Sequence, residues 1–417
     1  MEMNLFPPFS EQSKAELAQL ASVQNRLVNV QASQSNITIV QDCLLGNYMM
    51  TRTDDPIPKD DFFQILHSIQ DIPLDDIFQK IDDVKLVYKK FKKDIPLYSG
   101  KTLFSLLLPR DFMYNLGDVK IYMGILYEGS IKKANLGSKH QSIIRILTKE
   151  YSNDTTLTFI NNVQFLAVSF LMYHGFSVGI SDCLTTQKDE IRTVIARSML
   201  EAENVGSDTL DENIKEVRVT MALGRARDIG MRLAKNAVTD DNRFLHTINA
   251  GSKGDFFNFA QIGGLLGQQN VKGQRIQPAM SKKTRTLPHY TFNPTPQEEY
   301  ESKGFIRNSF IHGLNPQEFW AHASTGREGV LDTALKTANS GYIQRKMVKI
   351  MEDMQVKYDN TVRNSVGSII QFAYGGDGLD GTSTVIKQGS YTPHVCDIER
   401  LADRLNLCHE MKIEMKH

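Results

Sequence analysis

Side chains that could bind a metal ion are few and scattered in this sequence. The one grouping with metal-ligand residue types lies near the C-terminus and consists of His394, Cys396, Cys408 and His409. Tetrahedral zinc sites usually space their paired ligands by two or more residues, whereas Cys408 and His409 are adjacent. The chain also has no Cys-x-x-Cys pair. We therefore expect no zinc on this chain.

Basic side chains could contact phosphates at three places. The clusters are Lys89 to Lys93, Lys282 to Arg285, and Arg345 to Lys349. Taken alone, each cluster is more often a solvated face than a phosphate site. Lys253 lies in Gly-Ser-Lys-Gly, which is not the phosphate-binding loop Gly-x-x-x-x-Gly-Lys-Ser/Thr, so a separate ATPase is disfavoured. His322 is better explained as a packed or solvated histidine than as a catalyst.

The composition indicates the broad class of protein to which this chain belongs. The chain has 417 residues, of which 41% are hydrophobic, and its 48 basic and 48 acidic residues balance. This length favours two or three domains, and the zero net charge gives no hint of a polyanionic partner. Four cysteines in so long a chain fit a reducing compartment. No apolar run of about 18 to 20 residues is evident, so we expect no membrane partner.

The elements change character along the chain. Residues 37–180 mix turns with short branched and aromatic runs, such as residues 119–126 and 142–148, which predict either a mixed α/β unit or a β-rich unit. Residues 185–236 are rich in helix formers with a break near residues 206–209, which predicts a helical hairpin. Residues 250–285 are rich in Gly and Gln, which indicates either packed backbone or a surface approached closely by a partner.

The clearest helix signal follows. Asn315 is an N-cap candidate, Pro316 suits the first helical position, and Glu318 completes a capping box. We expect one helix from Pro316 to about Tyr358, long enough to cross between domains.

The middle of this helix is rich in small residues: Thr333, Ala334, Thr337, Ala338, Ser340 and Gly341. One interpretation is close helix packing, which needs small side chains. The other is a bendable helix against which a flat ligand, such as a base pair, can lie. Basic residues at its C-terminal end also suit the helix dipole, so they do not decide between the two.

These residues resemble the bridge helix of the largest subunit of multisubunit DNA-directed RNA polymerases, of the eukaryotic and large-DNA-virus type. The similar segments are Leu314-Asn315-Pro316-Gln317-Glu318-Phe319, Gly326-Arg327-Glu328-Gly329, Asp332 to Arg345, Tyr358 to Asn364 and Tyr374 to Asp380. Upstream, the similar segments are Ala250 to Gly254, Gly267-Gln268-Gln269, Arg285 to His289 and Glu301 to Phe305. They occur in the order of the family's pore and funnel segments, and the resemblance fades after about Gly381.

The resemblance implies an α+β multidomain fold with a β-rich pore domain, a helical-hairpin funnel and a long bridge helix. Its expected divisions are the tail of the active-site domain (1–23), the pore domain (24–184), the funnel domain (185–309), and the bridge helix with the start of the cleft or foot region (310–417). Residues 383–417 match no motif of the family.

The resemblance also implies roles for single residues. Thr337 and Ala338 would abut the nascent base pair, Tyr342 would pack near the template, and Lys336, Arg345 and Lys346 would contact backbone phosphates. Lys253, Gln268 and Gln269 would line the pore, where nucleotides enter, backtracked RNA leaves and a transcript-cleavage factor docks.

No catalytic residue is expected on this chain. Met1 to Leu5 resemble the tail of the family's signature Asn-Ala-Asp-Phe-Asp-Gly-Asp-Glu-Met-Asn, whose aspartates hold the catalytic magnesium, and Phe6 departs from the family's histidine. Mg²⁺ would thus be held by the preceding fragment, and the chain would be the middle piece of a split subunit or of a truncated one, inactive alone. Its trigger loop would also lie elsewhere.

The expected partners are other polymerase subunits, neighbouring fragments, DNA template, RNA and nucleoside triphosphates. The expected location is intracellular, in the nucleus or cytoplasm, or in the virion or viral factory of a large DNA virus. The alternative function is a noncatalytic helical regulator or remnant that binds polymerase or nucleic acid. The ordered motifs disfavour it, because an unrelated scaffold has no reason to reproduce them in sequence.

Overall fold

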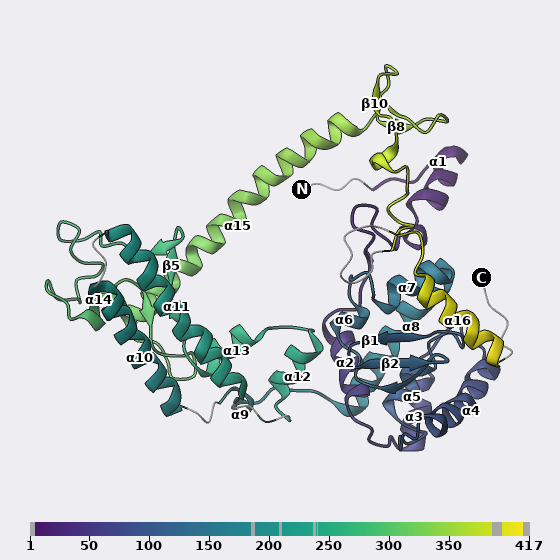
Figure 1. The fold of residues 1–417 in the computed structure, drawn as a ribbon, viewed down its shortest axis with the longest axis horizontal. Helices are drawn as coiled ribbons and strands as arrows, with labels where there is room; N and C mark the ends of the chain where they lie inside the picture. Colours follow the sequence, from purple (N-terminus) through teal and green to yellow (C-terminus); the bar gives the residue numbers. More distant parts are fainter. Residues whose placement is uncertain are drawn as a thin grey trace.

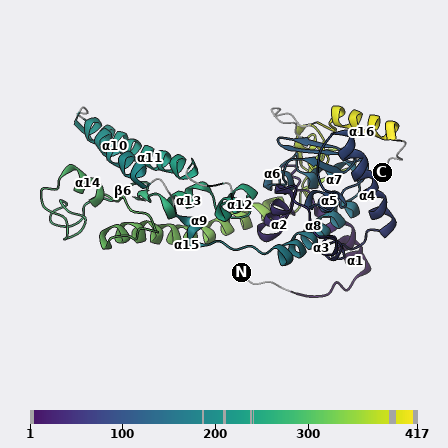
Figure 2. The same cartoon turned by 90° about the horizontal axis from the view of Figure 1, so that it is seen from below.

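Two bodies and a long helix make up the molecule (Figure 1). The computed structural model describes residues 5–184, 188–207, 211–236, 239, 241–385 and 394–411. Figures 1 and 2 both show the two bodies at opposite ends of an elongated molecule. Residues 1–4, which carry most of the resemblance to the magnesium-binding signature, lie outside the described part.

The first body is mainly helical. One core cluster, which includes Phe62, Phe104, Phe112 and Phe159, holds it together. Its elements are α1 (Glu11–Glu16), η1 (Leu17–Ala21), η2 (Val23–Arg26), α2 (Gln41–Arg52), α3 (Lys59–Leu66), α4 (Leu74–Lys90), α5 (Gly100–Ser105), β1 (Tyr114–Leu116), β2 (Val119–Tyr122), β3 (Ile125–Glu128), α6 (Lys133–Leu136), α7 (Ile143–Glu150) and α8 (Asn153–His174).

The strands of this body form one antiparallel sheet in the order β1-β2-β3. Tyr114 pairs with Ile121, and Tyr122 pairs with Ile125 across a tight turn. Gly124 in that turn has φ +68°, and a Cβ there would lie 2.3 Å from the carbonyl oxygen of Pro109. The predicted strand run at residues 119–126 is therefore two strands, because this turn divides it.

Of the two alternatives for this first unit, the mixed one fits the structure and the β-rich one is wrong, because helices dominate the body. In particular, the run at residues 142–148 forms helix α7. Ser142 caps this helix by accepting a hydrogen bond from the backbone N–H of Arg145, 3.2 Å away. Ile143, Ile144 and Leu147 are buried, at spacings that fit one helix face.

Helix α8 is long and apolar enough, by length and composition alone, to cross a membrane. The expectation that no such run exists is therefore wrong. A buried core helix passes the same test, and Phe159, Val163 and Leu166 of α8 lie in the main core. Asn162, in its middle, donates from its side chain to the carbonyl of Gln70 and accepts from the same residue's N–H.

The second body contains the predicted helical hairpin. Helices α10 and α11 pack against each other, and Met199, Val219 and Leu223 share a core with Leu265 and Phe305. The predicted break lies between these helices, although residues 208–210 are outside the described part. The elements are α9 (Ile180–Cys183), α10 (Lys188–Ser207), α11 (Glu212–Asn236), α12 (Arg243–Ala250), α13 (Phe256–Gly263), β4 (Gly267–Gln268), β5 (Asn270–Val271), β6 (Gln274–Arg275), α14 (Pro296–Ser302) and β7 (Phe305–Ile306).

The two bodies meet where α12 packs on α2. Ala250 is buried in a cluster with Leu45 and Tyr48 of α2. At Gly251, which follows α12, a Cβ would lie 2.7 Å from the Cβ of Lys133. The glycine thus permits the two bodies to approach closely. This fits the interpretation that the Gly-rich stretch is packed backbone.

Helix α15 (Pro316–Met351) begins on the second body and runs away from it (Figure 1). Its 36 residues span about 54 Å, since each residue adds about 1.5 Å. It ends seven residues before the predicted end at Tyr358, because the chain turns there into a small antiparallel sheet. That sheet contains β8 (Gln355–Val356), β9 (Val362–Arg363) and β10 (Ile369–Gln371), followed by η3 (Tyr374–Gly376).

The chain then returns to the first body, where α16 (Ile398–Met411) lies over the sheet β1-β2-β3 and near α7 (Figure 1). Buried Leu407 of α16 joins Val84, Val87 and Ile125 in a small core cluster.

Candidate functional site

The start of α15 is fixed to the second body by one carboxylate. Glu318 accepts hydrogen bonds from the backbone N–H of Asn315 at 3.0 Å and of Arg307 at 3.2 Å, and from the side-chain amide of Asn308 at 2.9 Å. This is the predicted reach of Glu318 back to the N-cap residue, and it satisfies backbone donors that a helix leaves unpaired.

Further contacts follow along the first turns of α15. Ala321 is buried. His322 lies edge-on to Phe310, with ring centroids 5.5 Å apart, and its Nδ1 is 3.3 Å from Oε1 of Gln269. The carboxylate of Glu328 accepts from the backbone N–H of Lys272 at 2.8 Å. His322 is thus a packed histidine, in agreement with the expectation from the sequence.

Beyond Glu328 the helix is exposed on all sides. Every residue from 329 to 351 is exposed, including the large apolar side chains Val330, Leu331, Leu335, Tyr342, Ile343, Met347, Val348, Ile350 and Met351. Leu335, for instance, exposes 67% of its surface. Apolar residues placed all round a helix are typical of one that is buried. The pattern therefore indicates that a partner outside the described residues covers this span.

Five of the six predicted contact residues on α15 lie within one half of its circumference. Successive helical residues are rotated by about 100°, so Thr337, Ala338, Tyr342, Arg345 and Lys346 fall within a sector of about 180°. Ala334 and Gly341 fall in the same sector between Thr337 and Ala338, which makes that strip low and open. In support of this, a Cβ added to Gly341 would meet nothing within 4 Å.

Lys336 does not lie in this sector. It is rotated by about 180° from Arg345 around the helix. Its Nζ donates to Asp332 at 2.7 Å, and this hydrogen bond raises the pKa of Lys336. The structure therefore separates Lys336 from the other predicted contact residues and places it in an exposed i,i+4 ion pair.

Three cations follow the small residues along the helix. Nζ of Lys346 lies 3.9 Å from the ring centroid of Tyr342. Lys349 pairs with Glu352 at 3.0 Å. Within the part of the chain that the structure describes, no ion pair of Arg345 is found. The planar guanidinium of an arginine can contact a phosphate through two parallel hydrogen bonds.

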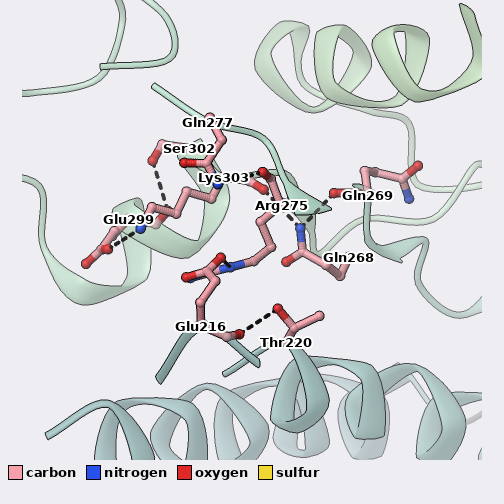
Figure 3. Close-up of polar contacts among 9 residues, drawn as sticks. All are labelled: Glu216, Thr220, Gln268, Gln269, Arg275, Gln277, Glu299, Ser302 and Lys303. Atoms are coloured by element: carbon pink, nitrogen blue, oxygen red, sulfur yellow. Dashed lines mark hydrogen bonds and ion pairs between the residues drawn. The ribbon is translucent and has the colours of Figure 1, made fainter. Parts of the chain in front are cut away.

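The three predicted pore residues are only partly brought together. Lys253 is exposed in the turn between α12 and α13. Gln268 and Gln269 lie at β4, and Figure 3 shows their side chains pointing in opposite directions. The amide of Gln268 donates to the carbonyls of Gln269 at 2.8 Å and of Lys303 at 2.9 Å, whereas that of Gln269 reaches α15 through His322. The two glutamines are therefore engaged inside the second body.

No sequence pattern indicated the partly buried ion pair next to Gln268. Arg275 of β6 donates from Nε and Nη2 to the two carboxylate oxygens of Glu216 of α11, each at 2.6 Å (Figure 3). The Arg275 side chain is 2% exposed, and its guanidinium lies 5.8 Å from the ring centroid of Tyr300. Fifty-nine residues separate the partners, and no local pattern marks either one. This pair ties the helical hairpin to the strands beneath α15.

Among the described residues, no group of three or more His, Cys, Asp or Glu side chains is placed to hold a metal ion. His394, Cys396, Cys408 and His409 are all in that part of the chain. These four side chains are therefore not gathered around one common position.

Comparisons with known protein families give three matches in chain order. A family model described as RNA polymerase Rpb1, domain 3, matches residues 26–183, domain 4 matches residues 197–306, and domain 5 matches residues 313–407.

Two kinds of relatives match over most of this chain. A probable DNA-directed RNA polymerase II subunit RPB1 homolog of Invertebrate iridescent virus 6 is 40% identical over 99% of the chain and 42% of the relative's length. The DNA-directed RNA polymerase II subunits RPB1-A and RPB1-B of Trypanosoma brucei brucei are 35% identical over 91% of the chain and 22% of their own length. The chain thus spans less than half the length of these curated relatives.

Proposed function

Because the chain belongs to the Rpb1 family, the largest subunits of multisubunit DNA-directed RNA polymerases, we propose that it forms the nucleotide-entry pore, the funnel and the bridge helix of such an enzyme. In this proposal residues 1–23 end the active-site domain and residues 24–184 form the pore domain. Residues 185–309 form the funnel, and residues 310–417 form the bridge helix with the start of the cleft or foot.

The exposed span of α15 carries this proposal. A helix isolated in water gains little stability from its own hydrogen bonds, and in proteins most helical stability comes from packing. Residues 329–351 nevertheless expose nine large apolar side chains and pack on neither body. Nucleic acid and neighbouring polymerase segments on both sides of a bridge helix would cover such a span.

The strip of small residues would serve as the surface for the nascent base pair. Thr337 and Ala338 would lie against the pair, and Tyr342 would pack near the template base. Arg345 and Lys346 would contact backbone phosphates, which fixes position without reading sequence. Lys336 lies on the opposite side of α15 from Arg345, so it would contact a different partner or solvent.

Nucleotidyl transfer uses two magnesium ions that stabilise the attacking and leaving oxygens. In this proposal their carboxylate ligands come from another part of the enzyme. The role of α15 is to present the template base and to exclude water from one side of the reaction site. The isolated chain is therefore expected to be inactive, although it remains part of a nucleotidyltransferase.

The second body would line the route by which nucleoside triphosphates enter. Exposed Lys253 would attract their phosphates, whereas Gln268 and Gln269 would hold the base of α15 in place. We propose that a transcript-cleavage factor binds transiently to this surface. Other polymerase subunits, DNA and RNA are the proposed permanent partners, inside the cell or in a viral particle.

Affinity purification of the tagged chain from its native source, followed by a template-dependent RNA synthesis assay, tests the proposal. Recovery with a second-largest polymerase subunit and with RNA synthesis activity is the expected result. Recovery of the chain alone, or with partners unrelated to transcription and without synthesis, would contradict it.

A further inference from the structure

The C-terminal part of the chain is fastened to the first body at two places. The first is residues 381–384. Arg145 of α7 donates to the carbonyl oxygens of Ser33 at 2.8 Å, Thr382 at 2.9 Å and Thr384 at 2.8 Å. The Arg145 side chain thus holds two segments that lie more than 300 residues apart in sequence.

Residues 381–384 approach the first body very closely. The hydroxyls of Ser33 and Thr384 are 2.7 Å apart, and Nζ of Lys149 donates to the carbonyl of Ser383 at 2.6 Å. At Gly381 a Cβ would lie 2.0 Å from the carbonyl oxygen of Val30. Any larger residue at position 381 would therefore force these segments apart.

The second place is helix α16. Arg404 donates from Nε to a carboxylate oxygen of Asp111 at 2.8 Å and from Nη1 to the carbonyl of Glu150 at 3.2 Å. Both side chains of this ion pair are less than 7% exposed. The Arg404 guanidinium also lies 4.1 Å from the ring centroid of Tyr151. One turn earlier, Arg400 pairs with the carboxylate of Glu150.

These contacts are positioned to fix the far end of α15. From Met351 the chain runs through β8, β9 and β10 to Gly381 (Figure 1). Among the residues that the structure describes, residues 381–384 and α16 then attach the chain to the first body. The near end is fixed to the second body by Glu318 and His322. Buried ion pairs contribute little net stability when compared with apolar packing. They require one particular geometry, so they can fix the position of one segment relative to another.

We propose that residues 381–384 together with α16, the C-terminal latch, position α15 during RNA synthesis. The inference rests on the proposed function of α15. Most of this segment lies within the Rpb1 domain 5 match, which reaches residue 407, so the expectation that residues 383–417 match nothing of the family is wrong up to that residue. Arg404, Asp111 and Arg145 are positioning residues, which act through the placement of α15 and touch no substrate.

The test compares distances and elongation in the assembled polymerase. Spin labels carried by unnatural amino acids at Lys357, beyond the end of α15, and at Asp75 on α4 report the separation of the helix end from the first body. Both positions are exposed. Arg404→Met removes the charge and keeps the side chain's length, which leaves Asp111 buried without its partner.

The matched control is Lys85→Met, which breaks the exposed ion pair of Lys85 and Asp82 on α4 of the same body. We expect one narrow distance distribution in the wild type and in this control. In Arg404→Met we expect loss of that single peak, a displaced second population, and slower elongation per assembled complex with the KM for nucleotides little changed. If Arg404→Met fails to assemble, Arg400→Gln is measured instead, because its ion pair with Glu150 is more exposed.

An unchanged distance distribution in the latch variant would overturn the inference, whatever happens to the yield of complex. The outcome is separable from the proposed function. A displaced helix end with normal elongation supports the latch and contradicts the proposed role of α15. An unmoved helix end, together with an elongation defect in α15 variants, contradicts the latch and supports the proposed role of α15.

Discussion

At the scale of single residues, the size of the side chain at position 338 decides whether a base pair can lie against α15. We predict that Ala338→Leu slows elongation by about tenfold to a hundredfold, since a displacement of about 1 Å at a reacting centre has effects of that size. Leucine favours helices, so α15 should form normally. Single-nucleotide addition by the reconstituted enzyme is the measurement.

Ser340→Leu is the matched control for this substitution. Ser340 is also small and exposed, and it lies about 160° around the helix from Ala338. Its replacement should leave elongation within about twofold of the wild type. Equal slowing by both substitutions would show that bulk anywhere on α15 is harmful and would remove the argument for a specific base-pair surface.

The ion pair of Arg275 and Glu216 gives a second prediction. Glu216→Gln should lower the free energy of unfolding by about 1–2 kcal/mol, less than for a fully buried pair because Glu216 is about one-third exposed. Glu299→Gln, which weakens the neighbouring i,i+4 pair with Lys303, should cost less than about 0.5 kcal/mol, because Glu299 is nearly half exposed. Urea denaturation of both variants distinguishes these values, and equal losses would contradict the prediction.

This ion pair also predicts a dependence on pH. The hydrogen bond from Arg275 lowers the pKa of Glu216 from its ordinary value of 4.5. A carboxylate with a lowered pKa in the folded state stabilises the fold fully above its unfolded pKa, and the stabilisation is lost as the pH falls through the lower, folded value. The difference between the wild type and Glu216→Gln should therefore shrink in acid.

Residues with local signals were predictable, and residues with distant partners were not. Asn315, Pro316 and Glu318 lie within four positions, so their capping contacts follow from the sequence. His322 as a packed side chain was also predicted correctly. In contrast, the partners of Arg275 and Arg404 lie 59 and 293 residues away, and neither arginine stands out in its segment. The roles of Thr337, Ala338 and Tyr342 stay predictions.

At the scale of elements, the contact between α12 and α2 contains a buried histidine. His246 is 3% exposed, and Nη1 of Arg52 lies 2.7 Å from its Nε2. Since Arg52 can only donate, Nε2 accepts and the ring is neutral. Asp241, Asp182 and Arg243 also act on this ring. Burial first, and then Arg52, lower the pKa of His246 below its ordinary value of 6.5.

Acidification should therefore weaken the contact between the two bodies. The pKa of His246 is lower in the folded state than in the unfolded state, so above pH 6.5 the ring is neutral in both states and stability is unaffected. Below pH 6.5 the unfolded chain binds the proton more readily than the folded chain, so the free energy of unfolding falls. The midpoint of urea unfolding of the wild type should fall as the pH drops below about 6.5, and this fall should be smaller in His246→Gln. Exposed His67, replaced by Gln, is the control, and an equal response in both variants would contradict the prediction.

Element types were predictable where periodicity and length agreed. The helical hairpin of α10 and α11 and the long helix α15 follow from extended helix-forming runs. Residues 142–148 were misassigned because a short run with three isoleucines has the composition of a strand, yet Ser142 caps it and its apolar side chains face the core on one helix face. The end of α15 was misplaced because no Gly or Pro follows Met351 to mark it.

At the scale of the whole molecule, the exposed span of α15 makes the isolated chain prone to self-association. Leu335→Glu together with Ile343→Glu removes two apolar side chains from this span. We predict that the isolated double variant is more monomeric than the wild type and that it recovers fewer polymerase subunits on purification. Burying one such side chain contributes about 1.5–3 kcal/mol, so two should suffice to impair assembly.

Gln344→Glu is the control for added charge, since Gln344 is exposed on the same helix and carries little apolar surface. Analytical ultracentrifugation of the isolated chains and mass spectrometry of the purified complexes are the measurements. Equal behaviour of the double variant and this control would show that the span is not an assembly surface.

The attachment of α16 to the first body also has a consequence for synthesis on the ribosome. Asp111 and Arg404 are 293 residues apart, so at about 5–20 residues per second Arg404 is made roughly 15–60 s after Asp111. Throughout that interval the surface that α16 will cover, including Asp111, is open to water and to chaperones. The first body can therefore gain its contacts with α16 only after residue 404 has been translated.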